Sequence, residues 1–380
     1  MKANTHLPLL IALMMFPQFV ETIYSPALPL LSERFNISAE RASMTLSLYF
    51  IAFAIGIVFW GILSDRIGRK SVMMMGLIVY GFGALIGLVT SHFEILLFAR
   101  MIAAFGAAVG SVVTQTIMRD RYKKEELSYI FSIMGIALSL SPVVGMLIGA
   151  LLSSYLGLHG VFGCLLALAV ILIGATKLRL VESRPPFSSV PSLWNVFLQM
   201  VADRSIWKAS GLVASFNIIL FSYYALAPYV FEEAGHSSTE YGFSGLLLAA
   251  GSFIGGISNK AFIKRKVSPF SILLSATLIT CLGGLGVYCI EPSIWFIAPF
   301  VLCVIGYGIA IPTILSKALV DYQQVVGTAA AIFGLFYYIL IGIGLSLSGL
   351  IQDLGVVIVL MSFAALFLIC TGSMPDIKRP

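Results

Sequence analysis

One carboxylic acid, Glu21, lies well inside an apolar run of this chain. Gln18, Thr22 and Ser25 stand at helical spacing from it, so the four side chains can line one face of a helix. Burial in low-dielectric surroundings disfavours the charged carboxylate, so such a group can take up and release a proton. A cationic molecule can compete with the proton for the same carboxylate. These residue types therefore predict proton exchange coupled to the binding of a small molecule.

The basic counterpart is Arg100, which also lies within an apolar run. Small residues share its helical face and leave room beside the guanidinium group: Ala104, Ala107, Ser111 and Thr114. A charge deep in a bilayer costs roughly 2.5–3.5 kcal/mol or more, so Arg100 should face a water-filled cavity or a partner. Two simpler readings remain open. Arg100 could extend outward to the membrane surface, or it could form a structural ion pair with Glu21.

The elements that must position these groups are membrane spans. Of the 380 residues, 59% are hydrophobic and 11% charged, whereas a soluble domain carries roughly 25% charged residues. About 20 apolar residues suffice to cross a bilayer, and the first run is too long for a cleaved signal peptide. The pattern predicts an all-α membrane protein with 12 transmembrane helices. They are expected near 7–31, 42–63, 71–90, 93–117, 127–152, 157–180, 206–231, 240–259, 268–288, 292–316, 324–350 and 354–374.

Basic residues give the orientation. If the turn over 61–70 is cytoplasmic, nearly all of the 23 Lys and Arg fall on the same side of the membrane. Only Arg34 and Arg41 lie outside, and Arg100 lies within a span. Both termini are therefore expected in the cytoplasm. Because the net charge of +6 sits in short loops between apolar runs, it reflects topology, and we expect no nucleic-acid partner.

The long connection over 181–205 divides the chain. We expect an N-terminal six-helix bundle over 1–180, a cytoplasmic linker over 181–205 and a C-terminal six-helix bundle over 206–380. Ser192 is predicted to cap a short interfacial helix in the linker. A faint repeat places Gly255 on Gly61 and Asn259 on Asp65, which favours pseudo-symmetric halves with a binding site at the midplane.

The turn between the second and third spans carries the strongest motif. It matches in full the pattern G-x-x-x-D-R-x-G-R-K through Gly61, Asp65, Arg66, Gly68, Arg69 and Lys70. On this motif and the twelve spans, the chain resembles the major facilitator superfamily over essentially its whole length. The resemblance implies that superfamily's fold of two six-helix bundles and a role for the motif as a conformational latch. The simpler alternative is a tight glycine turn with charges that only set topology.

Two further stretches resemble one branch of this superfamily, the twelve-span drug:proton antiporters of the bicyclomycin- and chloramphenicol-resistance type. In the fourth span an arginine precedes spaced glycines, and the first span ends in a proline-rich stretch, Tyr24-Ser25-Pro26-Ala27-Leu28-Pro29, after an acid. The fifth span departs from the antiporter pattern, because Met146 and Ala150 replace a proline and a glycine. Helix packing is assigned to Gly106, Gly110, Pro142, Gly145 and Gly149.

The expected site combines Glu21 and Arg100 for proton coupling with polar groups for substrate. The pocket candidates are Gln18, Tyr24, Gln115, Asn217, Tyr223, Tyr224 and Tyr307, and for each of them ordinary helix packing is the alternative. No catalytic or metal-binding residues are expected. The five cysteines lie in apolar runs without a CxxC pair and read as core residues. No cofactor is expected, and the proton gradient would supply the energy.

The function expected from these features is proton-coupled export of small amphipathic compounds, as in multidrug efflux. The partners would be a small-molecule substrate, protons and membrane lipid, and we expect a monomer in the bacterial inner membrane. The alternative is a dedicated exporter or importer of one metabolite, such as a siderophore or an amino-acid derivative. An enzyme is not expected, because the sequence shows no HExxH motif, phosphate loop or soluble domain.

Overall fold

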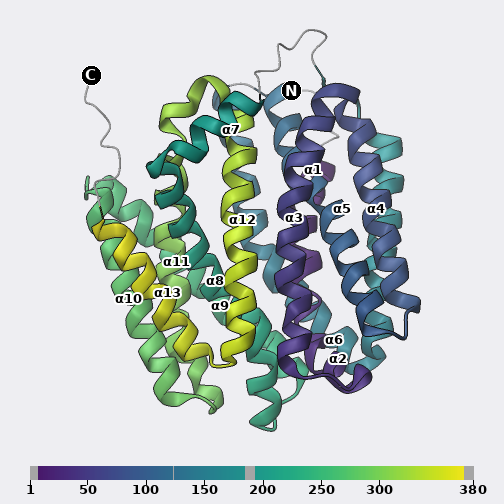
Figure 1. Cartoon of the computed structure of the whole chain (residues 1–380), viewed down its shortest axis with the longest axis vertical. Helices are drawn as coiled ribbons and strands as arrows, with labels where there is room; N and C mark the ends of the chain where they lie inside the picture. The colour runs from purple at the N-terminus through teal and green to yellow at the C-terminus, as the bar shows by residue number, and fades with distance from the viewer. Residues whose placement is uncertain (1–6, 123, 185–192, 372–380) are drawn as a thin grey trace.

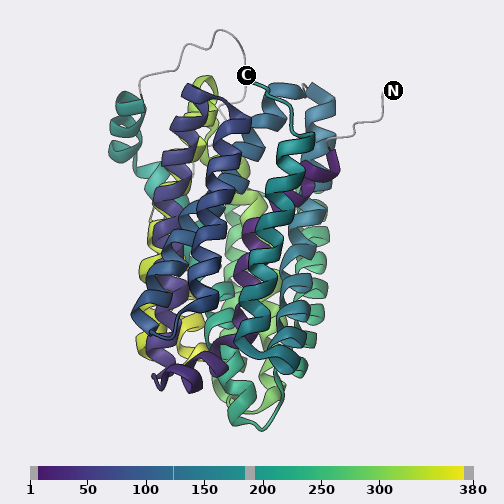
Figure 2. The same ribbon diagram turned by 90° about the vertical axis from the view of Figure 1, so that its right-hand side faces the viewer.

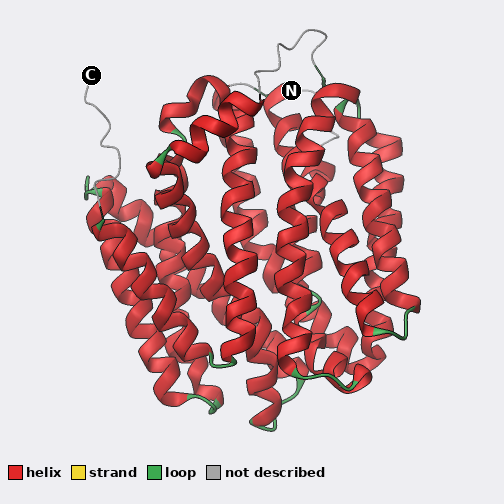
Figure 3. Cartoon of the chain, in the orientation of Figure 1, coloured by secondary structure: helices red, strands yellow, loops and turns green. Residues whose placement is uncertain are grey.

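A computed structural model describes residues 7–122, 124–184 and 193–371 of the chain. Within these ranges every regular element is a helix, and the helices run side by side along one long axis (Figures 1 and 3). Short turns join the long helices, so long helices that follow one another in sequence point in opposite directions. This arrangement agrees with the expected all-α membrane fold.

The first predicted span is interrupted. In place of one helix over 7–31, the chain forms α1, a short 3-10 helix η1 and then α2. Pro26 and Pro29 lack the N–H group that a continuous helix requires, which explains the break. The elements of this part of the chain are α1 (Leu7–Thr22), η1 (Ser25–Ala27), α2 (Leu28–Phe35), α3 (Ala39–Ile67), α4 (Arg69–Val89), α5 (Phe93–Arg121) and α6 (Lys124–Arg179).

Helix α6 is long enough to cross a membrane twice. It contains one residue with a non-helical backbone, Gly157, with φ 59° and ψ −156°. A positive φ favours glycine, so Gly157 allows the chain to turn back there. The turn separates the fifth and sixth predicted spans.

The remaining elements are α7 (Leu193–Ala202), α8 (Arg204–Glu233), α9 (Ser238–Lys264), α10 (Pro269–Ile290), η2 (Ile294–Phe296), α11 (Ile297–Ala318), η3 (Val320–Val325), α12 (Val326–Ile351) and α13 (Leu354–Cys370). Among the described residues, 10 helices are long and apolar enough to cross a membrane, with α1 to α2 taken as one. Helix α6 supplies two of the crossings, and α13 is a shorter apolar helix of 17 residues. The twelve predicted spans are therefore all accounted for.

The two ends of the bundle are distinct. We call the end that carries α7 and the Gly68 turn the linker end, and the opposite end, with the Gly157 turn, the far end. The start of α1 and the end of α13 lie toward the linker end (Figures 1 and 2). Residues 181–184 contact the first six spans, whereas α7 packs on α8 and α12. Residues 185–192, including the predicted cap Ser192, lie outside the described residues, and the division into domains stays a prediction.

Glycines allow the helices of the first six spans to pack closely. A Cβ atom on Gly106 would lie 2.7 Å from the Gly76 carbonyl oxygen on α4, and one on Gly110 would lie 2.6 Å from the Leu13 carbonyl oxygen on α1. Gly145 and Gly149 on α6 likewise lie directly against the end of α1. These four positions therefore hold α1, α4, α5 and α6 together by close backbone contact.

Two helix pairs form the most extensive contacts between the first six spans and the last six: α3 with α12, and α6 with α9. The α6–α9 contact contains the residues that depart from the antiporter pattern. A Cβ atom on Gly242 of α9 would lie 2.5 Å from the Ala150 Cβ, and one on Gly245 would lie 3.2 Å from the Met146 sulfur. Glycines on α9 thus provide the space that the larger residues on α6 occupy.

Candidate functional site

A central cavity of about 520 Å³ lies between α1, α3, α5 and α6 on one side and α8, α9, α11 and α12 on the other. Most of the polar residues expected at the site line it: Gln18, Glu21, Gln115, Asn217, Tyr224 and Tyr307. Tyr24 and Tyr223 do not. The Tyr223 hydroxyl contacts Ser244, and its ring stacks on Phe300 with centroids 4.4 Å apart, so Tyr223 belongs to the core. Pro142, assigned to helix packing, lines the cavity as well.

Glu21 is placed at the cavity wall with part of its carboxyl group unsatisfied. Its side chain is 4% exposed, and the buried Oε1 atom has no hydrogen-bond partner among the described residues. The Oε1 atom of Gln18, one turn earlier on α1, is also buried and has no hydrogen-bond partner among the described residues. A buried acceptor without a donor is unfavourable, so both oxygens are suited to a proton or to a ligand that brings N–H or O–H groups.

Arg100 does not line the cavity. Its side chain is 2% exposed, and its Cζ atom lies 4.0 Å from the ring centroid of Tyr24 and 4.8 Å from that of Tyr49. Such cation–π contacts stabilise a buried guanidinium group. Neither simple reading of Arg100 fits, because it is not at the surface and, within the described part of the chain, forms no ion pair with Glu21.

The contacts of Tyr24 and Tyr49 with Arg100 follow from helix packing. Gly110 lets α1 approach α5 closely, which brings Tyr24, just beyond the end of α1, over the guanidinium. The small residues Ala104 and Ala107 are fully buried in the same contact region. Tyr49 reaches the guanidinium from α3. Two aromatic rings, one from the end of α1 and one from α3, thus meet the buried charge on α5.

Sequence reasoning missed the aromatic side chains of α3. Tyr49, Phe50 and Phe53 all line the cavity. Phe50 lies 4.5 Å from Phe221 of α8 and Phe53 lies 5.0 Å from Tyr338 of α12, measured between ring centroids. Both sides of the bundle therefore contribute aromatic walls. Their spacing in the sequence could have indicated this, because Tyr49, Phe50 and Phe53 share one helical face.

The last six spans contribute neutral polar groups. Asn217 donates through Nδ2 to the Val213 carbonyl at 2.8 Å, and the Tyr307 hydroxyl donates to the Asn217 Oδ1 atom at 3.4 Å. Glu21 is the only acid among the residues described as lining the cavity, and none of them is Lys or Arg. The cavity thus combines apolar aromatic walls, several amide and hydroxyl groups and one carboxyl group.

The far end of the bundle is closed by hydrogen bonds across the two sets of spans. The buried Ser25 hydroxyl donates to the Tyr224 carbonyl at 2.5 Å and lies 2.6 Å from the Tyr241 hydroxyl. Nearby, the Tyr229 hydroxyl lies 2.8 Å from the Ser32 hydroxyl and donates to the Leu28 carbonyl at 3.1 Å. These contacts tie η1 and α2 to α8 and α9 on the far side of the central cavity.

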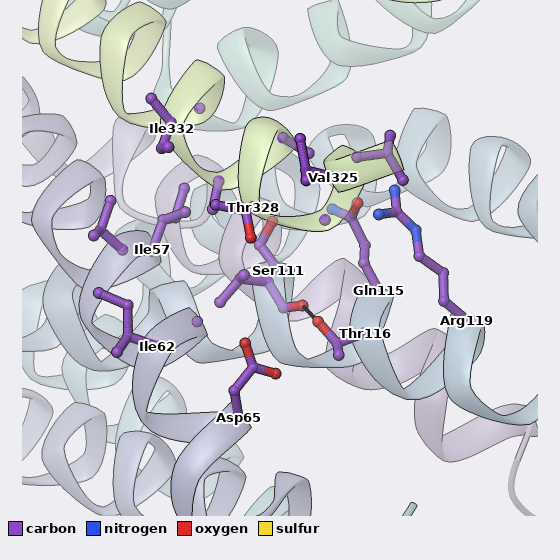
Figure 4. Close-up of a pocket in the computed structure, with 18 of the residues that line it drawn as sticks. Ile57, Ile62, Asp65, Ser111, Gln115, Thr116, Arg119, Val325, Thr328 and Ile332 are labelled. Carbon is purple, nitrogen blue, oxygen red and sulfur yellow. Dashed lines mark hydrogen bonds between the residues drawn. The ribbon is translucent and has the colours of Figure 1, made fainter. Parts of the chain in front are cut away.

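A second cavity of about 340 Å³ lies nearer the linker end (Figure 4). Its walls come from α3, α5 and the first half of α12, and it shares Ser111, Gln115 and Tyr337 with the central cavity. Asp65 and Arg119 line it, and both side chains point toward the start of α12. Lining residues are thus continuous from Glu21 to the linker end, in contrast to the closed far end.

The 61–70 turn is held by contacts with the first six spans and with residues 182–184 of the connection that follows them. Gly68 has φ 102°, which favours glycine. Arg69, 4% exposed, contacts Asp65 at 2.6 Å and Asp120 at 3.0 Å. Lys70 Nζ donates to the Lys177 carbonyl, and the Arg66 carbonyl accepts from Arg184.

Glu182, which sequence reasoning missed, completes this turn. Its carboxylate accepts the backbone N–H groups of Arg69 at 2.8 Å and Lys70 at 3.1 Å, at the N-terminus of α4. Burial acts to raise the pKa of Glu182, but these backbone donors and those of Ser183 and Arg184 outweigh it and hold the pKa below its usual range. No local pattern pairs Glu182 with a helix start that lies over a hundred residues earlier.

Comparison with known proteins identifies a matching family, related transporters and a structure of similar fold. Residues 10–345 match the sequence profile of the Major Facilitator Superfamily. The chain is 30% identical to an uncharacterized transporter of Rickettsia bellii, over 96% of this chain and 93% of the relative. It is 27% identical to a chloramphenicol resistance protein of Pseudomonas aeruginosa, over 84% of this chain and 78% of the relative. The POT family transporter PepTSo has a similar fold, with a TM-score of 0.78 at 12% identity and 97% coverage of both chains.

Proposed function

The chain belongs to the Major Facilitator Superfamily, and on that premise we propose that it exports small amphipathic compounds in exchange for protons. Membership makes it a multi-pass membrane transporter, and its relatives include drug-resistance proteins. Proton coupling, export and the choice of substrate are the proposal. It places the transporter as a monomer in the bacterial inner membrane, without a cofactor.

The observation that carries the proposal is the state of Glu21. It is the only acid among the described lining residues of the central cavity, and its Oε1 atom lacks a partner. A proton or a donor group of the substrate can satisfy the carboxyl group, but one carboxyl group cannot serve both fully at once. Competition for one site produces exchange when the transporter changes conformation only with a proton or a substrate bound, because each ligand must then leave before the other can cross.

The proposed orientation puts the linker end in the cytoplasm, because the basic residues lie there. The closed far end and the lining that continues to Asp65 then correspond to an inward-facing state. Substrate would bind from the cytoplasm, the linker end would close, and the far end would open to release substrate and load Glu21 with a proton.

The latch proposed for the 61–70 motif has a defined target. Asp65 lines the second cavity opposite the first turn of α12, whose residues Val326, Gly327 and Thr328 also line it. Closure of the linker end would bring the Asp65 carboxylate toward the positive N-terminal end of α12, a favourable contact. The second-half counterpart, Asn259, instead donates to the Ile309 carbonyl and to Thr313 in a buried contact. The charged latch is therefore asymmetric.

The cavity favours neutral or singly cationic compounds with an apolar, aromatic body. Aromatic walls come from both sets of spans, including Phe50, Phe221 and Tyr338, whereas the lining as described contains one acid and no base. The chloramphenicol resistance protein among the relatives supports small amphipathic compounds as substrates.

A compound-sensitivity panel tests the proposal. Cells that lack their own efflux pumps would express the wild type, Glu21→Gln or Arg100→Ala at matched membrane levels. The proposal predicts resistance to several amphipathic compounds with the wild type and loss of it with Glu21→Gln. Protection by the wild type against one compound only would favour the dedicated metabolite exporter. Full resistance in the Glu21→Gln strain would contradict the proposed role of this residue.

A further inference from the structure

We propose that Tyr49 sets the charge selectivity of the central cavity, because its ring separates Arg100 from the substrate. This inference rests on the proposed function, since it concerns the same cavity. It assigns to Tyr49 a role in specificity: with the ring in place the cavity accepts neutral and cationic compounds, and without it the cavity would accept anions.

The contacts of Tyr49 place it at this boundary. Tyr49 lines the cavity, whereas Arg100 does not, and the Tyr49 ring centroid lies 4.8 Å from the Arg100 Cζ atom. Two neighbours on α3 hold the ring: Phe53 stacks at 6.1 Å and Phe50 meets it edge-on at 5.9 Å. With 1% of its surface exposed, Tyr49 is fixed between the guanidinium group and the cavity.

Arg100 has unused capacity to bind an anion. Its Nε and Nη2 atoms are buried and lack hydrogen-bond partners in the part of the chain that the structure describes. A guanidinium group binds a carboxylate, sulfonate or phosphate through short, charge-assisted hydrogen bonds. Tyr24 covers Arg100 on another side at 4.0 Å, from outside the cavity lining. Tyr49 is therefore the lining residue whose ring lies directly on this charge.

The aromatic ring of Tyr49, and not its hydroxyl group, separates Arg100 from the substrate. The Tyr49 hydroxyl has no hydrogen-bond partner among the described residues, so Tyr49→Phe removes little and keeps the cover over Arg100. Tyr49→Leu and Tyr49→Met remove the aromatic ring but keep an apolar side chain. These substitutions form a matched set that separates the two parts of the side chain.

The test is a binding measurement on purified protein in lipid nanodiscs, with two probes of similar size, 1-naphthylmethylammonium and 1-naphthoate. Isothermal titration calorimetry at pH 7.5 would give both affinities, and thermal unfolding would confirm that each variant is folded. We expect the wild type and Tyr49→Phe to prefer the cation. Tyr49→Leu and Tyr49→Met should bind 1-naphthoate at least about tenfold more tightly than the wild type, because the anion reaches Arg100.

The double substitution Tyr49→Leu with Arg100→Gln identifies the cause of that gain. It should return 1-naphthoate binding to the wild-type level. If the double variant keeps the gain, or if the folded Leu and Met variants show none, the inference is wrong while the proposed function stands. If the wild type binds neither probe, the proposed substrate class is wrong and the inference is overturned with it.

Discussion

The Ser25 hydroxyl donates a hydrogen bond of 2.5 Å to the main-chain carbonyl of Tyr224, a residue that lines the central cavity from α8. The same hydroxyl lies 2.6 Å from the Tyr241 hydroxyl on α9. One fully buried serine on the interrupted first span thus bonds to two helices of the last six spans. These bonds must break before the far end can open.

Replacing Ser25 by alanine should favour the outward-open state. Loss of a buried hydrogen bond costs about 1 kcal/mol, which shifts a two-state population by roughly fivefold. Spin labels at the exposed positions Arg34 and Glu233 would report the distance across the far end by double electron–electron resonance. Ser362→Ala is the control, since that buried hydroxyl bonds only within its own helix, to Ile358. An unchanged distance distribution in Ser25→Ala would show that these bonds do not hold the far end closed.

Asp65→Asn should slow the transport cycle and leave substrate binding nearly unchanged. The substitution keeps the shape of the side chain but removes the charge that would meet the N-terminus of α12, worth about 0.3–1 kcal/mol and up to about 2. Turnover in proteoliposomes should fall several-fold, while the dissociation constant from calorimetry should change by less than about twofold. Asp120→Asn is the matched control, because Asp120 also contacts Arg69 but does not line the second cavity. Equal turnover of Asp65→Asn and wild type would rule out the latch.

Gly106→Ala should destabilise the packing of α4 against α5. The added Cβ atom would lie 2.7 Å from the Gly76 carbonyl oxygen, so one helix must move, at a cost of about 1–3 kcal/mol. The melting temperature of the purified protein should fall by several degrees. Gly163→Ala is the control, because no atom lies within 4 Å of its added Cβ. Equal melting temperatures for the two variants would mean that Gly106 is not a packing position.

Glu291 should make stability depend on pH. Burial, together with the nearby Asp353 carboxylate, raises the pKa of Glu291, at the far end of α10, from 4.5 to about 7. Ionisation is therefore disfavoured in the folded state, and stability present below about pH 4.5 is lost as the pH rises through 7. As the pH rises from 5 to 8, the melting temperature of Glu291→Gln should fall less than that of the wild type. In Asp353→Asn, the fall in melting temperature should begin at a lower pH than in the wild type. Identical dependence of the melting temperature on pH in all three proteins would contradict this assignment.

The number of spans and the place of the charged turn could be predicted because both depend on local sequence. The length of an apolar run decides whether it spans a bilayer, and loop charges decide its direction. The position of Glu21 could also be predicted, since an acid within a span is expensive unless it faces the interior of the bundle. The break at Ser25–Ala27 was visible as prolines, but its role in closing the far end was not.

Contacts between distant helices could not be predicted. Tyr49 meets Arg100 because of how α3 and α5 are rotated about their axes, and no periodicity in either helix specifies that rotation. Arg100 was therefore expected at the cavity and lies behind Tyr49 instead. Glu182 reaches the start of α4 for the same reason, through the folding of α6 back on itself at Gly157. Spacing and periodicity in a single sequence do not specify such contacts between distant residues.

The measurement that tests the central claim most directly is proton-driven transport by Glu21→Gln in proteoliposomes. Purified wild type and variant would be reconstituted at equal density, with a pH gradient imposed and both substrate and proton movement recorded. The account predicts that the wild type moves substrate against its concentration gradient as protons flow the other way. Glu21→Gln should bind substrate but lose both the uphill transport and the coupled proton flux. Full gradient-driven transport by Glu21→Gln would contradict the account.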